Sequence, residues 1–376
     1  MQQHMVVAVV RGERSGLVIS IACTDSYDII TFAFDYRPTS LVERSLHPMS
    51  SLTPLQASGV HPEVQQFFQS AVMVPARPAD PAEARVIAVI VTRDRPALLR
   101  RCLDAVLDQA RPPEAVIVID NASQDETREV LGHYPAVNCL RLARNVGGAG
   151  GFCAGIQHAL DDGAEWLWLM DEDGRPAGPS CLGGLLATAA AHRAELVGPL
   201  VVDVDARRRL SFPVRIAGRT LFDVEAVVQH GPVPGFAHLF NGALIHADLF
   251  RRIGLPDARF FIRGDEVEFL FRVRRAGARI VLDTAAHFLH PGSQRDIHPI
   301  LWGRFYAVVP QEATKQFYQF RNRAYIFRRY GMWGWLAADL VRYGCYFLIS
   351  QRADVAGLAR WIAATGCGIR GRFMRD

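Results

Sequence analysis

Residues 165–173 read EWLWLMDED, and this stretch decides the fold of the chain. Glu165–Met170 is mostly large and apolar, which is typical of a strand that is buried on both faces. Asp171, Glu172 and Asp173 follow at once. An isolated acidic triplet is more often a solvated turn, but its position directly after a buried strand favours a ligand site at the edge of a sheet.

Three similar units precede this stretch. We expect their strands at Val86–Val91, Ala115–Ile119 and Asn138–Leu142. Helical spacing of apolar residues separates them, at Pro96–Gln109, Asp125–Leu131 and Gly151–Asp161. Because parallel strands need crossover helices, this alternation predicts a doubly wound α/β domain with a mainly parallel sheet.

Polar side chains follow each of these strands. They are Thr92 and Arg93 after the first, Asp120 and Asn121 after the second, and Asn145 after the third. The carboxyl ends of parallel strands share one edge of a sheet, and ligands bind there. We therefore expect these side chains and the acidic triplet to surround one ligand.

The segment from Asn145 to Gly155, NVGGAGGFCAG, is rich in glycine and leads into a helix. Glycines such as Gly148 allow a backbone to approach a ligand closely, although packing of the helix on the sheet explains them equally well. The spacing resembles a dinucleotide fingerprint, which leaves an NAD-dependent oxidoreductase as an alternative. That fingerprint belongs after the first strand, where this chain has Thr92 and Arg93 instead.

The pair Asp171 and Asp173 predicts a divalent cation. Mg²⁺ and Mn²⁺ prefer oxygen ligands, and such an ion bridges a diphosphate and neutralises the charge that builds on it as it departs. A neutral imidazole can complete such a site. The candidates are His287 and His290, which follow a strand expected at Arg279–Leu282.

A second acidic cluster lies in the sequence GDEVEF, residues 264–269. Sugar transfer with inversion needs a carboxylate to take the proton of the acceptor hydroxyl, and Asp265 or Glu266 could serve. Glu268 is expected to pair with Arg272, four residues along the same helix. The alternative is that the whole cluster is a solvated helix surface.

These motifs together resemble the inverting family 2 glycosyltransferases of the GT-A fold. Within that family the likeness is to the bacterial galactofuranosyltransferases that build the cell-wall galactan. The resemblance rests on VIAVIVTRDRP, AVIVIDNAS, NVGGAGGFCAG and WLWLMDEDG, and it continues through FNGAL, FFIRGDEVEF, LHPGS and YQFRNRAY. It spans the chain from about Val86 to the C-terminal helices.

The resemblance implies a UDP-sugar donor and roles for individual residues. The nucleotide and its phosphates would be bound by Thr92, Arg93, Asp120, Asn121, Asn145, Gly148 and Asp171. Asp171 and Asp173 would hold Mn²⁺ or Mg²⁺, with His290 as the third protein ligand. Glu266 would be the general base with Asp265 beside it, although the family often has Asp as its base, so both assignments stay open.

The composition of the chain, and the segments outside the catalytic motifs, indicate its partners and its division into regions. The 376 residues carry a net charge of +4, which is too small to indicate a nucleic-acid partner. We expect a small β-rich region with a linker at 1–84, the GT-A domain at 85–310 and a helical region at 311–376. The seven cysteines form no CxxC pair, which favours reduced thiols in a cytoplasmic protein.

The helical C-terminal region carries aromatic residues and arginines. Trp333, Leu336, Leu340, Tyr343 and Phe347 share one helical stripe, which indicates either docking on the inner face of the cytoplasmic membrane or packing on the protein itself. No apolar run is long enough to span a bilayer without a charge. Membrane docking would suit a lipid-linked or polysaccharide glycan acceptor, and a homo-oligomer is a further expectation.

Two other functions fit the same motifs. A rhamnosyltransferase that uses dTDP-rhamnose would need the same fold and the same metal site. A non-catalytic scaffold could keep the fold and bind nucleotide without turnover.

Overall fold

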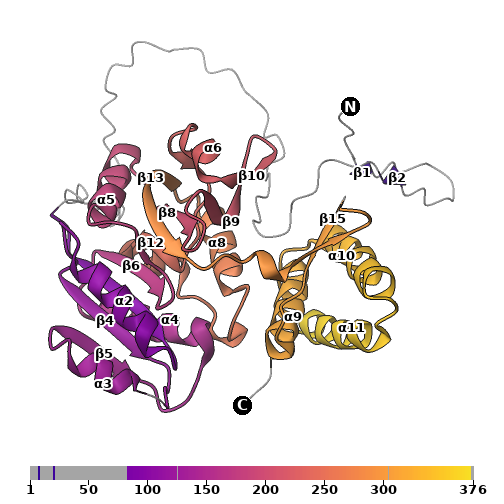
Figure 1. Cartoon of the computed structure of the whole chain (residues 1–376), viewed down its shortest axis with the longest axis horizontal. Helices are drawn as coiled ribbons and strands as arrows, with labels where there is room; N and C mark the ends of the chain where they lie inside the picture. Colours follow the sequence, from indigo (N-terminus) through magenta and orange to yellow (C-terminus); the bar gives the residue numbers. More distant parts are fainter. Residues whose placement is uncertain (1–6, 9–19, 22–82, 125, 304, 374–376) are drawn as a thin grey trace, which may run out of the picture.

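The computed structural model describes residues 7–8, 20–21, 83–124, 126–303 and 305–373 (Figure 1). The β-rich region expected at 1–84 lies almost entirely outside the described residues. Its described part is an antiparallel pair of two-residue strands, β1 (Val7–Ala8) and β2 (Ser20–Ile21).

The first half of the main sheet matches the predicted units closely. Its strands are β3 (Val86–Thr92), β4 (Ala115–Asp120), β5 (Val137–Arg141) and β6 (Trp166–Asp171). The helices between them are α2 (Pro96–Leu107), α3 (Thr127–Gly132) and α4 (Gly147–Asp161). The strands pair in parallel in the order β6-β3-β4-β5, so their carboxyl ends share one edge.

The second half of the sheet is mixed. Its larger strands are β8 (Leu196–Asp203), β9 (Arg209–Ile216), β10 (Arg219–Asp223), β12 (Asn241–His246) and β13 (Ile280–His290). Strand β12 is antiparallel to both β6 and β8, whereas β13 runs parallel to β8. Two short strands, β7 (Arg175–Pro176) and β11 (Val233–Pro234), pair with β13. The predicted α/β class with a largely parallel sheet is confirmed, and the antiparallel strands are an addition to it.

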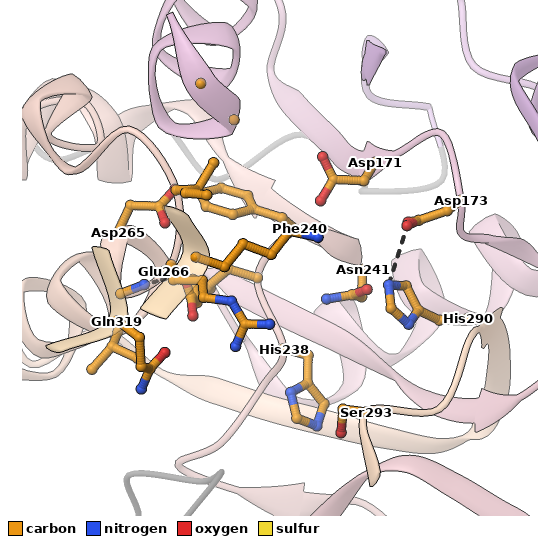
Figure 2. Close-up of a pocket in the computed structure, with 18 of the residues that line it drawn as sticks. Asp171, Asp173, His238, Phe240, Asn241, Asp265, Glu266, His290, Ser293 and Gln319 are labelled. Atoms are coloured by element: carbon orange, nitrogen blue, oxygen red, sulfur yellow. Dashed lines mark hydrogen bonds and ion pairs between the residues drawn. The ribbon is translucent and has the colours of Figure 1, made fainter. Parts of the chain in front are cut away.

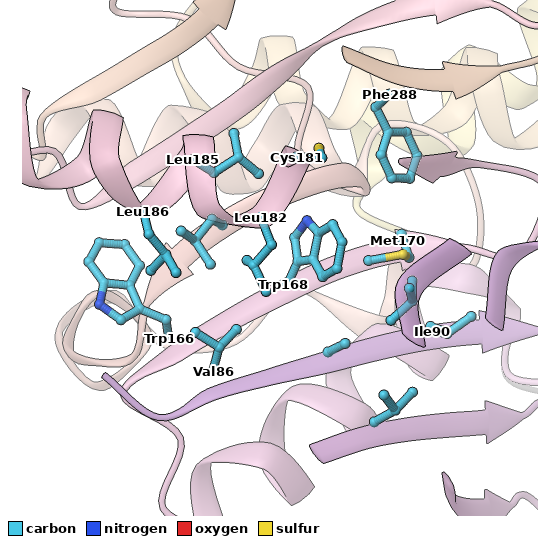
Figure 3. Close-up of a cluster of buried hydrophobic side chains, with 14 of the residues drawn as sticks. Val86, Ile90, Trp166, Trp168, Met170, Cys181, Leu182, Leu185, Leu186 and Phe288 are labelled. Atoms are coloured by element: carbon cyan, nitrogen blue, oxygen red, sulfur yellow. The ribbon is translucent and has the colours of Figure 1, made fainter. Parts of the chain in front are cut away.

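Helices cover both faces of this sheet. Besides the three named above, they are α5 (Cys181–His192), α6 (Val224–Val228), α7 (Ala247–Ile253), the short η1 (Ala258–Phe260) and α8 (Asp265–Arg275). Alternate residues of a strand point to opposite faces, and β3 is buried on both. Val86 and Ile90 pack in the layer that holds α2 and α5 (Figure 3), while Val89 packs in the layer of α4, α7 and α8.

The glycine-rich segment is the first part of α4, which begins at Gly147 and not at the predicted Gly151. A Cβ atom at Gly155 would lie 2.4 Å from a methyl carbon of Val89, so packing on the sheet requires glycine there. A Cβ at Gly147 would lie 2.1 Å from the carbonyl oxygen of Phe261. These contacts support the packing interpretation of the glycines over the dinucleotide fingerprint.

The chain then forms a hairpin and a group of helices beside the sheet (Figure 1). After η2 (Gln294–Asp296) come β14 (Ile297–Ile300), β15 (Phe305–Val308), α9 (Ala313–Arg329), α10 (Trp333–Cys345), η3 (Tyr346–Ser350) and α11 (Val355–Arg370). Within the described residues, no helix is long and apolar enough to cross a membrane.

The C-terminal stripe divides between the interior and the surface. Tyr343 and Phe347 are buried and share a hydrophobic cluster with Phe320 of α9. Trp333 and Leu340 of the same stripe are more than half exposed. Part of the stripe is therefore the core of the helical region, and the apolar surface that remains is smaller than the sequence indicated.

Candidate active site

A cleft of about 1070 Å³ lies at the carboxyl ends of β3, β4 and β6. Helices α8 and α9 and the end of β13 contribute its other walls. Most of the predicted site residues line it, namely Thr92, Arg93, Asn121, Asn145, Gly148, Asp171, Asp173, Asp265, Glu266 and His290 (Figure 2). The sheet edge thus gathers residues that are far apart in sequence.

Asp120, which the sequence predicted to bind the nucleotide, does not line this cleft. Its carboxylate is buried and accepts a hydrogen bond of 2.8 Å from the backbone N–H of Ser123. The guanidinium of Arg141 lies 3.5 Å from its other oxygen. Asp120 therefore fixes the turn after β4, and a nucleotide would meet its neighbour Asn121.

Asn121 and Asn145 join the end of β4 to the start of α4. The Asn121 amide donates to the Asn145 side-chain oxygen at 3.1 Å and to the Gly147 carbonyl at 3.0 Å. The Asn145 oxygen also accepts the Gly147 N–H at 2.9 Å. Gly148 lines the cleft, and a Cβ atom there would meet nothing within 4 Å, so the steric need for glycine lies at Gly147.

The two predicted residues at the end of β3, Thr92 and Arg93, differ in their surroundings. Thr92 is fully buried at the end of β3, and its hydroxyl has no hydrogen-bond partner among the described residues. Arg93 is exposed and forms an ion pair with Asp94 at 3.3 Å. A buried hydroxyl without a partner at the wall of a cleft is a position that a bound ligand can satisfy.

Arg95 and His290 contact the acidic triplet at the end of β6. Asp173 accepts a hydrogen bond of 2.8 Å from Arg95, and its other oxygen lies 3.3 Å from Nε2 of His290 (Figure 2). Burial raises the pKa of Asp173, but the interactions with His290 and Arg95 outweigh it and hold the pKa below its usual value. Burial and the charges of Asp173 and Glu172 instead raise the pKa of Asp171 well above its usual value.

These features fit a divalent cation. Asp171 and Asp173 offer oxygen ligands two residues apart, at and just after the end of β6. Oδ1 of Asp173 is buried, and within the described residues it forms no hydrogen bond and only the contact of 3.3 Å with His290. Burial, and then the charges of Asp173 and Glu172, raise the pKa of Asp171, and a bound cation would oppose both effects by favouring the carboxylate. Over the described ranges, however, no group of three or more His, Cys, Asp and Glu side chains is arranged to hold an ion. The third ligand therefore stays a prediction.

The two histidines of β13 have different places. The strand continues to His290, eight residues beyond its predicted end, and this extension carries His290 to the cleft. His287 is not among the lining residues, and its Nε2 lies 3.2 Å from the carbonyl oxygen of Thr284. His290 is thus the histidine that the structure brings to the acidic triplet.

Asp265 and Glu266 open α8 on another wall of the cleft (Figure 2). Asp265 is buried, and burial together with the neighbouring Glu266 carboxylate raises its pKa well above the usual value. Glu266 is half-buried and accepts the N–H of Gly264 at 3.0 Å. Burial therefore favours the protonated form of Asp265, and Glu266 is the more accessible carboxyl group of the pair.

Glu268 belongs to a separate network. It accepts hydrogen bonds of 2.9 Å from Arg272, as the four-residue spacing predicts, and of 2.9 Å from the hydroxyl of Tyr330. The side chain is 3% exposed and does not line the cleft. The surface-salt-bridge interpretation is therefore wrong about the exposure of Glu268, which is buried where α8 meets the C-terminal end of α9.

The sequence interpretation missed many residues of the cleft, and four of them are polar residues close to the predicted ones. Arg95 contacts the triplet, and its signal was its place in the same turn as Thr92 and Arg93. His238 and Asn241 each carry a buried polar atom without a hydrogen-bond partner among the described residues, and Gln319 lines the cleft from α9. No spacing rule points to these three, because they come from segments outside the repeated strand–helix units.

A family model and a curated relative match the chain. The sequence model for glycosyl transferase family 2 matches residues 87–246, which run from β3 to the end of β12. The galactofuranosyltransferase GlfT1 of Mycolicibacterium smegmatis is 42% identical over 297 residues, which cover 77% of this chain and 98% of the relative. The chain belongs to glycosyltransferase family 2.

Three further matches to this family 2 glycosyltransferase have lower identity. GlfT1 of Mycobacterium tuberculosis is 40% identical over 294 residues, with 77% of this chain and 96% of the relative covered. The dTDP-rhamnosyl transferase RfbF of Shigella flexneri is 22% identical over 295 residues, with 77% and 96% covered. The crystal structure of GalNAc-T7 with UDP, GalNAc and Mn²⁺ has a TM-score of 0.47 and 15% identity, over 72% of this chain and 57% of that one.

Proposed function

We propose that this family 2 glycosyltransferase transfers galactofuranose from UDP-galactofuranose to a glycan acceptor, with inversion at the anomeric carbon. The observation that carries the proposal is the identity of 42% to a galactofuranosyltransferase over nearly the whole length of that relative. The presence of both acidic clusters in one cleft supports the proposal. Sugar transfer needs a site that stabilises the departing diphosphate and a carboxylate that accepts the proton of the acceptor hydroxyl, and both must be within reach of one bound donor.

Glu266 is the proposed general base. Its carboxylate takes the proton of the acceptor hydroxyl as the hydroxyl oxygen bonds to the anomeric carbon and the bond to the UDP oxygen breaks. Burial and the neighbouring Glu266 carboxylate raise the pKa of Asp265 well above its usual value, so Asp265 holds a proton more readily than a solvated carboxyl group does. This division of roles favours Glu266 over Asp265 as the base.

The opposite wall is the proposed site of the leaving group. Asn121 and Asn145 would contact the nucleotide, and the unpaired hydroxyl of Thr92 would donate to a phosphate oxygen. Asp171 and Asp173 would hold Mn²⁺ or Mg²⁺, which when bound neutralises charge on the departing diphosphate. Arg95 and His290 hold the Asp173 carboxylate in place for this purpose.

Two alternatives are less well supported. The match to a rhamnosyltransferase is 22% identical, about half the identity to the galactofuranosyltransferases, so dTDP-rhamnose is the second donor to test. A non-catalytic scaffold would not need two acidic clusters that face one cleft. An NAD-dependent oxidoreductase is incompatible with membership of this family.

We also propose contact with a lipid surface for the helical region. The exposed large apolar side chains there include Leu340, Leu348, Ile349, Val355 and Ile362, and exposed arginines are close in sequence. Apolar side chains flanked by arginine favour an interface with anionic headgroups. We expect the protein to sediment with phosphatidylglycerol vesicles and not with phosphatidylcholine vesicles. Equal sedimentation in both, or in neither, would contradict this part of the proposal.

A donor screen tests the proposed reaction. UDP or dTDP release is followed with Mn²⁺ present, using UDP-galactofuranose, UDP-galactopyranose, UDP-glucose and dTDP-rhamnose. We expect UDP-galactofuranose to be the best donor and EDTA to abolish release. Release from dTDP-rhamnose alone would move the protein to the second candidate function.

Two variants accompany the screen. Asp173→Ala removes the carboxylate between Arg95 and His290 and should abolish release from every donor. Asp108→Ala, at an exposed position outside the cleft, is the matched control and should keep full activity. Activity that survives both EDTA and Asp173→Ala would overturn the proposed metal site.

A further inference from the structure

Helix α9 reaches the active-site cleft, although the sequence placed it in a separate helical region. Lys315, Gln319 and Arg323 all line the cleft, and their spacing of four residues puts them on one face of the helix. Figure 2 shows Gln319 beside Glu266, with Asp171 and Asp173 farther across the pocket. The wall that α9 provides therefore lies on the side of the proposed base.

Gln319 is the member of this row whose side chain is uncommitted. Lys315 is paired with Glu312 at 2.6 Å, and Arg323 is paired with Asp339 of α10 at 2.5 Å. Gln319 is half-buried and makes no hydrogen bond or ion pair with the described residues. Its amide offers donors and an acceptor without a charge, which suits the hydroxyl groups of a neutral sugar.

The neighbouring face of α9 is clamped to the loop that leads into the base. The Asn322 amide donates to the carbonyl oxygens of Phe260, Ile262 and Arg263 at 3.0, 3.0 and 2.6 Å. Arg321 donates to the Phe260 carbonyl at 2.9 Å and to the Asn322 side-chain oxygen at 2.7 Å. Both side chains are almost completely buried.

These hydrogen bonds hold a segment whose backbone conformation is energetically unfavourable. Phe261 and Arg263 have φ angles of 67° and 62°, in the left-handed region that costs a residue other than glycine about 1–3 kcal/mol. Gly264 follows with φ of 91°, and a Cβ atom there would lie 3.2 Å from Cβ of Asn322. Because Asp265 comes next, the position of Glu266 is fixed relative to α9 and hence to Gln319.

We propose that α9 is the acceptor wall of the cleft and that Gln319 hydrogen-bonds a hydroxyl group of the acceptor sugar. This inference rests on the proposed function, since the acceptor must present its reacting hydroxyl to Glu266. The nucleotide and phosphates belong at the other wall, with Asn121, Asn145 and the acidic triplet. The Arg321–Asn322 clamp is the positioning element that keeps the acceptor wall and the base in register.

Gln319→Ala tests the contact. Transfer is measured at saturating UDP-galactofuranose to an octyl glycoside, chosen from a panel of octyl furanosides and pyranosides as the fastest acceptor of the wild-type enzyme. We expect kcat/KM for this acceptor to fall roughly 10-fold, as loss of one hydrogen bond predicts. UDP release to water without acceptor, and the KM for the donor, should not change.

Gln316→Ala is the matched control on the same helix. Gln316 donates to the Pro310 carbonyl at 2.7 Å and does not line the cleft, so this variant should retain the wild-type acceptor kinetics. An acceptor kcat/KM that is unchanged in Gln319→Ala, or a parallel loss of release to water, would overturn the inference. A wild-type enzyme that transfers no galactofuranose to any glycoside would instead overturn the proposed function.

Asn322→Asp tests the clamp without changing the size of the side chain. The carboxylate cannot donate to three carbonyl oxygens, so the loop should lose its hold and kcat should fall at least 10-fold, with a smaller change in the donor KM. Asn138→Asp makes the same chemical change at an exposed position of β5 and should leave kcat unaltered. Equal kcat in the two variants would show that α9 does not position the base.

Discussion

The two acidic clusters of the chain look alike in sequence and are used differently in the fold. Asp171, Glu172 and Asp173 end a buried strand, and all three line the cleft. Asp265, Glu266 and Glu268 begin a helix, and its rotation separates them. Asp265 and Glu266 line the cleft, whereas Glu268 is turned into a buried contact with Arg272 and Tyr330.

The difference shows how secondary structure sorts carboxylates that are close in sequence. A strand end followed by a tight turn can present successive side chains to one ligand, and cationic partners then set which of them stay charged. In a helix, side chains two positions apart point in different directions. Glu266 therefore lines the cleft, whereas Glu268 contacts Arg272 and Tyr330. Catalytic and structural acids can therefore be distinguished within the second cluster by substitution.

The largest expected effect in this comparison is that of Glu266→Gln. The amide keeps the shape of the side chain but cannot accept the proton, so kcat should fall between about 100-fold and 10,000-fold. The affinity for UDP, measured by calorimetry, should stay within a factor of about two because Asn121 and Asn145 are untouched. Retention of more than a tenth of the wild-type kcat would exclude Glu266 as the base.

Asp265→Asn is the companion to that variant. An amide can donate a hydrogen bond as the protonated carboxyl does, so we expect a loss of kcat of about 10-fold at most. The same assay decides between the neighbours. If Asp265→Asn were the more damaging change, the base would be Asp265 and the roles proposed here would be reversed.

Glu268→Ala should affect stability more than catalysis. The substitution leaves Arg272 and the Tyr330 hydroxyl each without one buried partner, which should lower the free energy of unfolding by about 1–3 kcal/mol. Urea denaturation followed by tryptophan fluorescence measures this, and kcat at a temperature where the variant is folded should be unchanged.

Glu225→Ala is the control for that stability measurement. Glu225 is exposed and lies 3.8 Å from an exposed Arg208, so its loss should change the free energy of unfolding by less than about 0.5 kcal/mol. If the two variants were equally stable, the buried network around Glu268 would contribute nothing measurable.

The first half of the sheet was predictable because its signals are local. A strand such as Val86–Val91 is uniformly apolar, and the polar residue at its end marks the ligand edge. The end of β13 was not predictable in the same way. Its last residues continue a pairing with β8 after an irregularity between Asp283 and His287, and that long-range contact carries His290 to the cleft.

The helical region shows what periodicity alone leaves undecided. An amphipathic stripe indicates that one face of a helix is covered, and it does not say by what. Tyr343 and Phe347 are covered by α9, while Leu340 is exposed. The burial of Arg321 and Asn322 could not be predicted from the sequence either. Two polar residues in a helix normally indicate a solvated face, but here both side chains are buried against Phe260.

The last prediction concerns the pH dependence of stability and sharpens the description of the first cluster. Burial, and then the charge of Asp173, raise the pKa of Glu172 from 4.5 to about 7 against the opposing charge of Arg95. Between these pH values the folded chain retains a proton that the unfolded chain has lost, so in EDTA the free energy of unfolding should fall as the pH rises, by at most about 1.4 kcal/mol per pH unit. Glu172→Gln removes this titration, and its stability relative to wild type should increase from pH 5 to pH 8 in urea denaturation. Parallel pH profiles for the two proteins would mean that Glu172 is already ionised in the folded state, and that Arg95 rather than a proton balances the charge of the triplet.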